Sequence, residues 1–168
     1  VGKARCNRCH EGAMLSNFEF HNLGLAPRPW LDPQDLGRYE GIPKVKNDPF
    51  NAAGPYSDAP DSQPARELEF TAQISENKGQ CKTPSLRNVE QTAPYMHGGH
   101  FETLREVVEF YNDLDEEPVL VGHRDETLEE LDLSDEEIDA LVAFLESLTG
   151  EPIPAELKEQ PESPLLDQ

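Results

Sequence analysis

The sequence has 168 residues, a length that suits a single domain with a hydrophobic core. It contains 34 acidic and 14 basic residues, a formal net charge of −20, so nucleic acid and anionic membrane surfaces are poor partners because both would repel it. No apolar run approaches the roughly 18 residues that a membrane span needs. Only 36% of the residues are hydrophobic and 15 are prolines, which predicts a small core.

The most informative motif lies near the start of the chain and reads Cys6-Asn7-Arg8-Cys9-His10. Two cysteines three positions apart, followed at once by a histidine, are the signature of covalent haem c attachment. On a helix these positions share one face, so both thiols can form thioethers to the porphyrin while His10 binds the iron. A zinc site would need a second pair of ligands, and a redox Cys-x-x-Cys would be expected near a βαβ pattern. The sequence shows neither, and we predict haem c with Cys6 and Cys9 as tethers and His10 as the proximal ligand.

A covalent haem has consequences for the rest of the chain. It supplies a large apolar body around which loops can pack, and this compensates for the small core. Haem c is attached outside the cytoplasm, so we expect a periplasmic or extracellular protein whose start at Val1 is a processed or truncated one. Cys81 is left over and is expected to be a buried, inert thiol.

The first half of the chain shows little regular periodicity. We predict a short helix over residues 3–13 that carries the haem motif and ends near Gly12. From residue 14 to residue 80, prolines and glycines interrupt every helical pattern. So long an irregular stretch is unusual in a compact domain, and wrapping a prosthetic group is one of the few arrangements that accounts for it.

An amphipathic helix is predicted after Thr103, which is its expected N-cap. Leu104, Val107, Val108 and Tyr111 fall at i, i+3, i+4 and i+7 and form one inward-facing stripe.

A second helix is predicted near the end of the chain. Ser134 and Glu137 form a capping box before it, and Gly150 ends it. Residues 113–130 are an acidic connection between the two helices. The apolar face of the second helix consists of Ile138, Leu141, Val142, Leu145 and Leu148.

These elements predict a mainly α, cytochrome c-like fold in which a few helices and long loops wrap around one covalent haem c. Residues 1–150 are expected to form the haem domain. Residues 151–168 are expected to be an acidic, proline-rich tail.

Six blocks beyond the haem motif follow one another in the order of a known family. They read Phe20-His21-Asn22-Leu23-Gly24, Asp35-Leu36-Gly37-Arg38, Lys82-Thr83-Pro84-Ser85-Leu86-Arg87-Asn88-Val89, Thr92-Ala93-Pro94-Tyr95-Met96-His97-Gly98-Gly99, Glu109-Phe110-Tyr111-Asn112 and Leu141-Val142-Ala143-Phe144-Leu145-x-x-Leu148-Thr149-Gly150. With the haem motif, they resemble the di-haem cytochrome c peroxidase/MauG family, in particular its second, C-terminal haem domain. The third and fourth blocks are far more specific than the haem motif, which all c-type cytochromes share.

The resemblance implies a role in electron transfer. The family uses two haems in two domains, one of which meets hydrogen peroxide while the other passes electrons, and the match is to the second. We therefore expect a haem electron-transfer domain of a peroxidase-type oxidoreductase, with another haem domain or a basic redox protein as its partner. Two alternatives stay open. The chain could be a free-standing mono-haem carrier or electron-conducting subunit without catalysis of its own, or a direct peroxidase with an open iron site.

The sixth iron ligand is also suggested by the resemblance. Tyr111 stands where peroxidases of the family carry a methionine and MauG-like members a tyrosine, and tyrosine binds ferric haem iron in catalase. Met96 is the second choice, an open or water-bound site is the third, and a tyrosine that only hydrogen-bonds within the core is the plainer interpretation. His97 is expected beside the haem without binding iron.

Further positions gain roles from the same blocks. Arg87, Arg38 and Lys82 are cations that would pair with the haem propionates, although plain surface positions fit them equally well. Thr92 and Pro94 would supply main-chain carbonyl oxygens to half of a Ca²⁺ site between the two haem domains, because carbonyl oxygens suit calcium.

Overall fold

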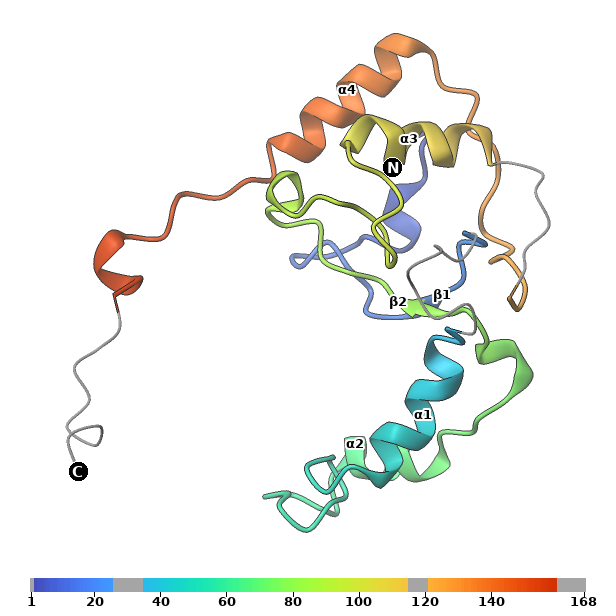
Figure 1. Cartoon of the computed structure of the whole chain (residues 1–168), viewed down its shortest axis with the longest axis vertical. Coiled ribbons are helices and arrows are strands. Elements are labelled where there is room, and N and C mark those ends of the chain that lie inside the picture. Colours follow the sequence, from blue (N-terminus) through green and yellow to red (C-terminus); the bar gives the residue numbers. More distant parts are fainter. Residues whose placement is uncertain (1, 26–34, 115–120, 160–168) are drawn as a thin grey trace.

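The computed structural model describes residues 2–25, 35–114 and 121–159. Its main elements are four helices and one two-stranded antiparallel sheet, so the mainly α prediction is confirmed (Figure 1). The helices are α1 (Arg38–Asn47), α2 (Gln63–Phe70), α3 (Leu104–Asp113) and α4 (Asp135–Glu146), the strands are β1 (Phe20–His21) and β2 (Cys81–Lys82), and the short 3₁₀ turns are η1 (Cys6–Arg8), η2 (Ser75–Asn77), η3 (Val89–Gln91) and η4 (Ala155–Leu157).

Helices α3 and α4 pack against each other and are two of the three helices that the sequence predicted. Thr103 caps α3, with its hydroxyl accepting from the Glu106 N–H while the Glu106 carboxylate accepts from the Thr103 N–H. Ser134 and Glu137 make the same capping box at α4. These reciprocal bonds satisfy N–H groups that a helix start otherwise leaves without partners.

The predicted end of α4 is wrong by four residues. The helix ends at Glu146, and the chain then tightens into 3₁₀-type bonds, such as that from the Leu148 N–H to the Leu145 carbonyl (3.2 Å). Gly150 instead donates its N–H to the side-chain oxygen of Asn88 at 2.8 Å. The glycine therefore joins the helix exit to the loop before η3.

Helices α1 and α2 were not predicted, and the expectation of an irregular stretch over residues 14–80 is wrong for this part. Ile42 in α1 and Ala65 in α2 are the single buried residue of each helix. Pro43 interrupts α1, and α2 has only eight residues, so neither sequence shows a long apolar stripe. Both helices project away from α3 and α4 (Figure 1). At the base of this projection, the Arg38 N–H donates to the Gln80 carbonyl at 2.8 Å. A Cβ on Gly37 would lie 2.4 Å from that same oxygen, so the close approach requires glycine.

The haem motif does not form the predicted helix over residues 3–13. Its regular part is the three-residue turn η1. Arg5 (φ 53°) and Gly12 (φ 68°) have left-handed backbone conformations on either side of it. A right-handed helix cannot continue through such residues, so the motif stays a single turn.

Loops after the motif pack on the segment around β2. The Ser16 hydroxyl donates to the Thr83 carbonyl at 2.8 Å, and the Thr83 N–H donates to the Glu19 carbonyl at 2.9 Å. Farther along, the Ser85 hydroxyl donates to the Met14 carbonyl at 2.7 Å. These bonds hold the loop that follows the motif.

The apolar core is small, as the composition predicted. Within the described residues, no large side chain is less than 2% exposed. The buried hydrophobic residues are Ile42, Ala65, Leu104, Val108, Leu114 and Ile138. None of the described helices has the length and apolar character needed to cross a bilayer.

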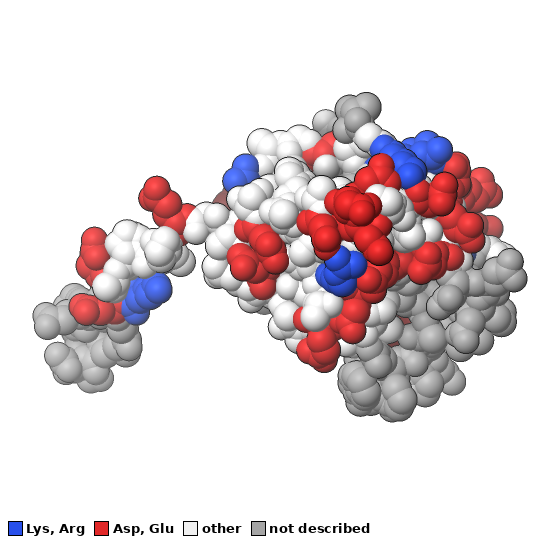
Figure 2. Space-filling model, turned by 90° about the horizontal axis from the view of Figure 1, so that it is seen from above, with Lys and Arg blue, Asp and Glu red and all other residues white. Residues whose placement is uncertain are grey.

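Acidic side chains dominate the face that Figure 2 shows from above, with few basic ones among them. Two of the cations on the described surface pair with α4, Lys3 with Glu137 at 2.9 Å and Arg105 with Asp139. Beyond α4, residues 151–159 are all exposed and lead away from the other elements. The division into a domain and a tail stays a prediction.

Candidate haem site

The Cys-x-x-Cys-His motif closes into one backbone turn. The N–H groups of Cys9 and His10 both donate to the Cys6 carbonyl, at 3.3 and 2.9 Å. This turn holds the two thiols and the imidazole within a single short segment, as two thioether tethers and a proximal ligand require. Desolvation raises the pKa of the Cys6 thiol and that of the Cys9 thiol.

The imidazole of His10 is oriented by the loop that follows it. Its Nδ1 lies 3.0 Å from the Leu15 carbonyl oxygen. A carbonyl can only accept, so Nδ1 carries the proton and Nε2 keeps its lone pair. Burial lowers the pKa of His10, and the carbonyls of Leu15 and Pro84 partly oppose this. A neutral ring with one nitrogen fixed by a carbonyl is the usual state of an iron- or zinc-binding histidine.

Tyr111 lies in α3 close enough to the motif for its ionisation to depend on both thiols. Desolvation raises the pKa of Tyr111 well above its ordinary value, and the charges of Cys6 and Cys9 would raise it further. The phenol is therefore neutral unless a strong cation such as ferric iron stands beside it.

Met96, the second candidate ligand, has a left-handed backbone (φ 67°) in the turn after the cis Ala93–Pro94 bond. Its carbonyl accepts the Gly99 N–H at 3.1 Å.

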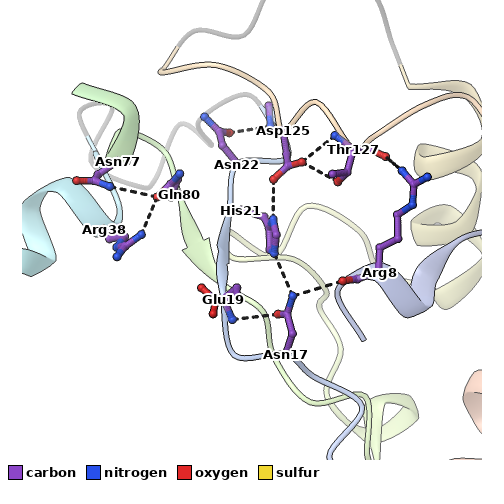
Figure 3. A network of polar contacts seen from close by, with 11 residues as sticks. Arg8, Asn17, Glu19, His21, Asn22, Arg38, Asn77, Gln80, Asp125 and Thr127 are labelled. Atoms are coloured by element: carbon purple, nitrogen blue, oxygen red, sulfur yellow. Dashed lines mark hydrogen bonds and ion pairs between the residues drawn. The ribbon is translucent and has the colours of Figure 1, made fainter. Parts of the chain in front are cut away.

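A polar network lies beside the motif and reaches it at Arg8 (Figure 3). The Asp125 carboxylate accepts from His21 Nδ1 at 2.6 Å and, through its other oxygen, from the N–H and hydroxyl of Thr127 at 2.8 and 2.6 Å. His21 Nε2 lies 3.4 Å from Asn17 Nδ2, which also contacts the Arg8 carbonyl at 3.4 Å. The Arg8 guanidinium closes the ring by donating to the Thr127 carbonyl at 3.1 Å. Both ring nitrogens of His21 are therefore engaged within this network.

Sequence reasoning missed Asp125 and Thr127, which lie in the segment interpreted as an acidic connection. An aspartate that accepts from the N–H two residues later forms an Asx turn, and Asp-Glu-Thr is compatible with one. That local signal could have indicated a turn. It could not have shown that the turn meets His21, 104 residues away.

The three cations expected near the propionates have partners within the protein. Arg87 donates from Nε to the Ala13 carbonyl at 2.8 Å, so it holds the loop after the motif. The Arg38 guanidinium lies 4.5 Å from the centre of the Phe20 ring. Lys82 Nζ lies 5.1 Å from the centre of an aromatic ring, that of Phe18.

His97 and the residues expected to bind calcium lie in exposed positions. His97 Nε2 is 2.7 Å from an oxygen of Asp35, whose other oxygen accepts the Gly37 N–H at 2.9 Å. Thr92 and Pro94 are both exposed. Within the ranges that the structure describes, no group of three or more histidine, cysteine or acidic side chains could hold a metal ion.

Cys81 lies in β2, opposite His21 of β1. It is half-buried, and burial raises the pKa of its thiol to about 11. The group is therefore a protonated thiol at neutral pH, as expected for an inert cysteine.

The donor set fits haem c. Two thiols within one turn can bind the porphyrin, a neutral imidazole offers Nε2 to iron, and a phenol lies on the neighbouring helix. Thiolate, imidazole and phenol oxygen are all established iron or porphyrin partners in haem proteins.

No family model matches the chain. Comparison with curated proteins finds cytochrome-c peroxidases and MauG proteins among its relatives. The cytochrome-c peroxidase IdrP2 of Denitromonas iodatirespirans is 37% identical over 161 residues, covering 91% of this chain and 38% of that protein. IdrP1 of the same organism, also a cytochrome-c peroxidase, is 38% identical over 155 residues, covering 88% and 38%. The methylamine utilization protein MauG of Paracoccus denitrificans is 33% identical over 176 residues, covering 86% and 39%.

Solved structures agree with this result. A MauG-like protein associated with microbial copper homeostasis superposes with a TM-score of 0.55 at 26% identity, covering 89% of this chain and 43% of that one. A variant of the diheme peroxidase BthA from Burkholderia thailandensis shares the fold, with a TM-score of 0.50, 21% identity and coverage of 86% and 38%.

The chain spans about two fifths of the length of its curated relatives. By its sequence similarity over most of its own length, it belongs to the family of cytochrome c peroxidases and MauG proteins.

Proposed function

We propose that this chain is a haem c electron-transfer domain of a cytochrome c peroxidase/MauG-type oxidoreductase. The observation that carries the proposal is the closed motif turn, in which His10 donates its Nδ1 proton to the Leu15 carbonyl and leaves Nε2 for iron. Cys6 and Cys9 would hold one haem through thioethers. The haem would supply an iron that accepts and releases one electron.

Tyr111 is the proposed distal ligand. It lies near the two tether thiols, and its phenol is desolvated, so the cost of ionising it falls only when ferric iron is adjacent. An anionic oxygen ligand favours ferric iron and lowers the reduction potential, whereas the thioether of Met96 would raise it. His10 and Tyr111 would hold the iron together, so peroxide would have to displace one of these side chains to react there. This favours electron transfer over peroxide chemistry at this haem.

The partner would be another haem domain or a basic redox protein, because the acidic face attracts positive charge (Figure 2). Haem attachment of this type places the protein in the periplasm or outside the cell. Thr92 and Pro94 would contribute carbonyl oxygens to a Ca²⁺ shared with a second domain. Residues 1–150 would form the haem domain and residues 151–168 its tail.

Resonance Raman and EPR spectra of the haem-loaded protein test the ligand assignment. Tyr111→Phe should remove the phenolate vibrations and convert the ferric haem to an open or water-bound form, and Tyr111→Met should raise the reduction potential. Tyr56→Phe is the matched control, because Tyr56 is 67% exposed and stacks on Phe50 far along the chain from the motif. Unchanged spectra in Tyr111→Phe, with loss of an axial ligand in Met96→Leu, would refute the tyrosine assignment.

A further inference from the structure

The polar network of Figure 3 reaches the haem motif at three points. The Arg8 guanidinium donates to the Thr127 carbonyl at 3.1 Å, and the Arg8 carbonyl lies 3.4 Å from Asn17 Nδ2. The third point is the Cys9 carbonyl, which accepts the Asn17 N–H at 2.7 Å. The network therefore joins the backbone that carries both tethers to the Asp125 segment, although these parts are more than a hundred residues apart in sequence.

Among the residues that Figure 3 labels, Asp125 is the one whose carboxylate takes part in these hydrogen bonds. Its side chain is 21% exposed, and that of His21 is 20% exposed. Desolvation alone would raise the pKa of Asp125, but hydrogen bonds from Thr127 and His21 outweigh it and lower the pKa, which keeps the carboxylate ionised.

A fixed negative charge next to a redox centre stabilises the oxidised form more than the reduced form, since ferric iron carries one more positive charge. Half-buried charges are screened by solvent much less than exposed ones. We propose that Asp125, which His21 and Thr127 hold beside the attachment motif, lowers the reduction potential of the haem through its negative charge. This rests on the proposed function, because it requires the haem that Cys6, Cys9 and His10 would bind.

The test is the midpoint potential of the haem-loaded full chain, measured by spectroelectrochemical titration at neutral pH. Asp125→Asn removes the charge and keeps one oxygen, which can still accept from Thr127, while the amide nitrogen takes the position of the oxygen that faces His21. Two unit charges roughly 10 Å apart at an effective dielectric constant of about 20 interact strongly enough to change an equilibrium on the order of tenfold. For a one-electron couple a tenfold change corresponds to 59 mV, so an upward shift of about that size is expected.

Two controls separate charge from structure. Glu126→Gln makes the same charge change at the next, exposed position and should move the potential far less. Thr127→Val removes a hydroxyl donor to Asp125 without changing charge, so it too should leave the potential near the native value. Asp125→Glu keeps the negative charge, so its midpoint potential should lie close to the native value.

Equal shifts in Asp125→Asn and Glu126→Gln would overturn the inference, as would a shift in Thr127→Val as large as that in Asp125→Asn. Asp125→Ser serves as a second neutral variant if Asp125→Asn does not accumulate. Haem content, measured on each denatured protein, distinguishes a failure of haem attachment from a failure of the charge effect. Absence of haem from the native chain refutes the proposed function, whereas a haem-loaded Asp125→Asn protein with the native potential refutes only this inference.

Discussion

Replacing Asn22 with alanine tests how the loops around the motif are held together. The side chain joins three segments that are far apart in sequence. Its Nδ2 donates to the carbonyls of Val121 at 2.7 Å and Lys78 at 3.2 Å, and its Oδ1 accepts the Gly24 N–H at 2.8 Å. Asn22 is 6% exposed, so water cannot replace these bonds without entering the structure.

The expected loss of stability follows from those three bonds. A typical intramolecular hydrogen bond contributes about 1 kcal/mol net, and leaving a buried partner unsatisfied costs about 1–3 kcal/mol. Asn22→Ala should therefore lower the free energy of unfolding by about 3 kcal/mol. With a denaturant slope of about 2 kcal/mol per molar urea, the midpoint of unfolding should fall by about 1.5 M.

Asn51→Ala is a closely matched control. Asn51 makes the same pattern of bonds, with Nδ2 donating to the Val45 and Lys46 carbonyls at 2.8 and 3.2 Å and Oδ1 accepting the Ala53 N–H at 2.8 Å. These bonds are exposed and local, so water can replace them and the loss should be about 1 kcal/mol or less. Urea unfolding of the haem-loaded proteins, followed by far-ultraviolet circular dichroism, measures both. A loss for Asn22→Ala no greater than that for Asn51→Ala would refute the reasoning.

Three further predictions concern stability. Gly122→Ala should cost about 2–4 kcal/mol, because φ is 68° and the new Cβ would lie 2.1 Å from the Lys78 carbonyl oxygen; urea unfolding measures it, and a native midpoint would contradict it. Ser134→Ala should cost about 1 kcal/mol by removing the cap of α4, and Ser134→Asp should restore most of the thermal stability if the cap is the cause. The Gly37 N–H holds the pKa of Asp35 below its ordinary 3.8, so the stability that this carboxylate contributes is complete above pH 3.8 and is lost as the pH falls through the lower folded value. The difference in unfolding free energy between native protein and Asp35→Asn should accordingly shrink between neutral pH and about pH 3, and a difference that stays constant with pH would exclude this linkage.

Local signals predicted what local interactions determine. The capping boxes at Thr103 and Ser134 depend on residues three positions apart, and the structure has both helix starts where they were expected. The haem motif was recognised from five consecutive residues, but its helix was overestimated, because the left-handed backbone at Arg5 is set by its surroundings and not by its residue type.

Long-range contacts were beyond the reach of the sequence. Gly41 and Pro43 interrupt α1, and α2 has only eight residues with a proline in its first turn, so neither shows a helical period long enough to reveal it. The pair of His21 and Asp125 joins a strand to a loop 104 residues away. Each partner alone is an ordinary polar residue, and only the fold brings them together beside the motif.

The central claim is that Cys6 and Cys9 carry a haem covalently, with iron on His10. The intact mass of the denatured protein, produced in a host with haem c attachment machinery, tests it most directly. The expected mass is that of the polypeptide plus one haem, and the haem should be lost when both Cys6 and Cys9 are replaced by serine. A native protein with the mass of its amino acids alone would contradict it.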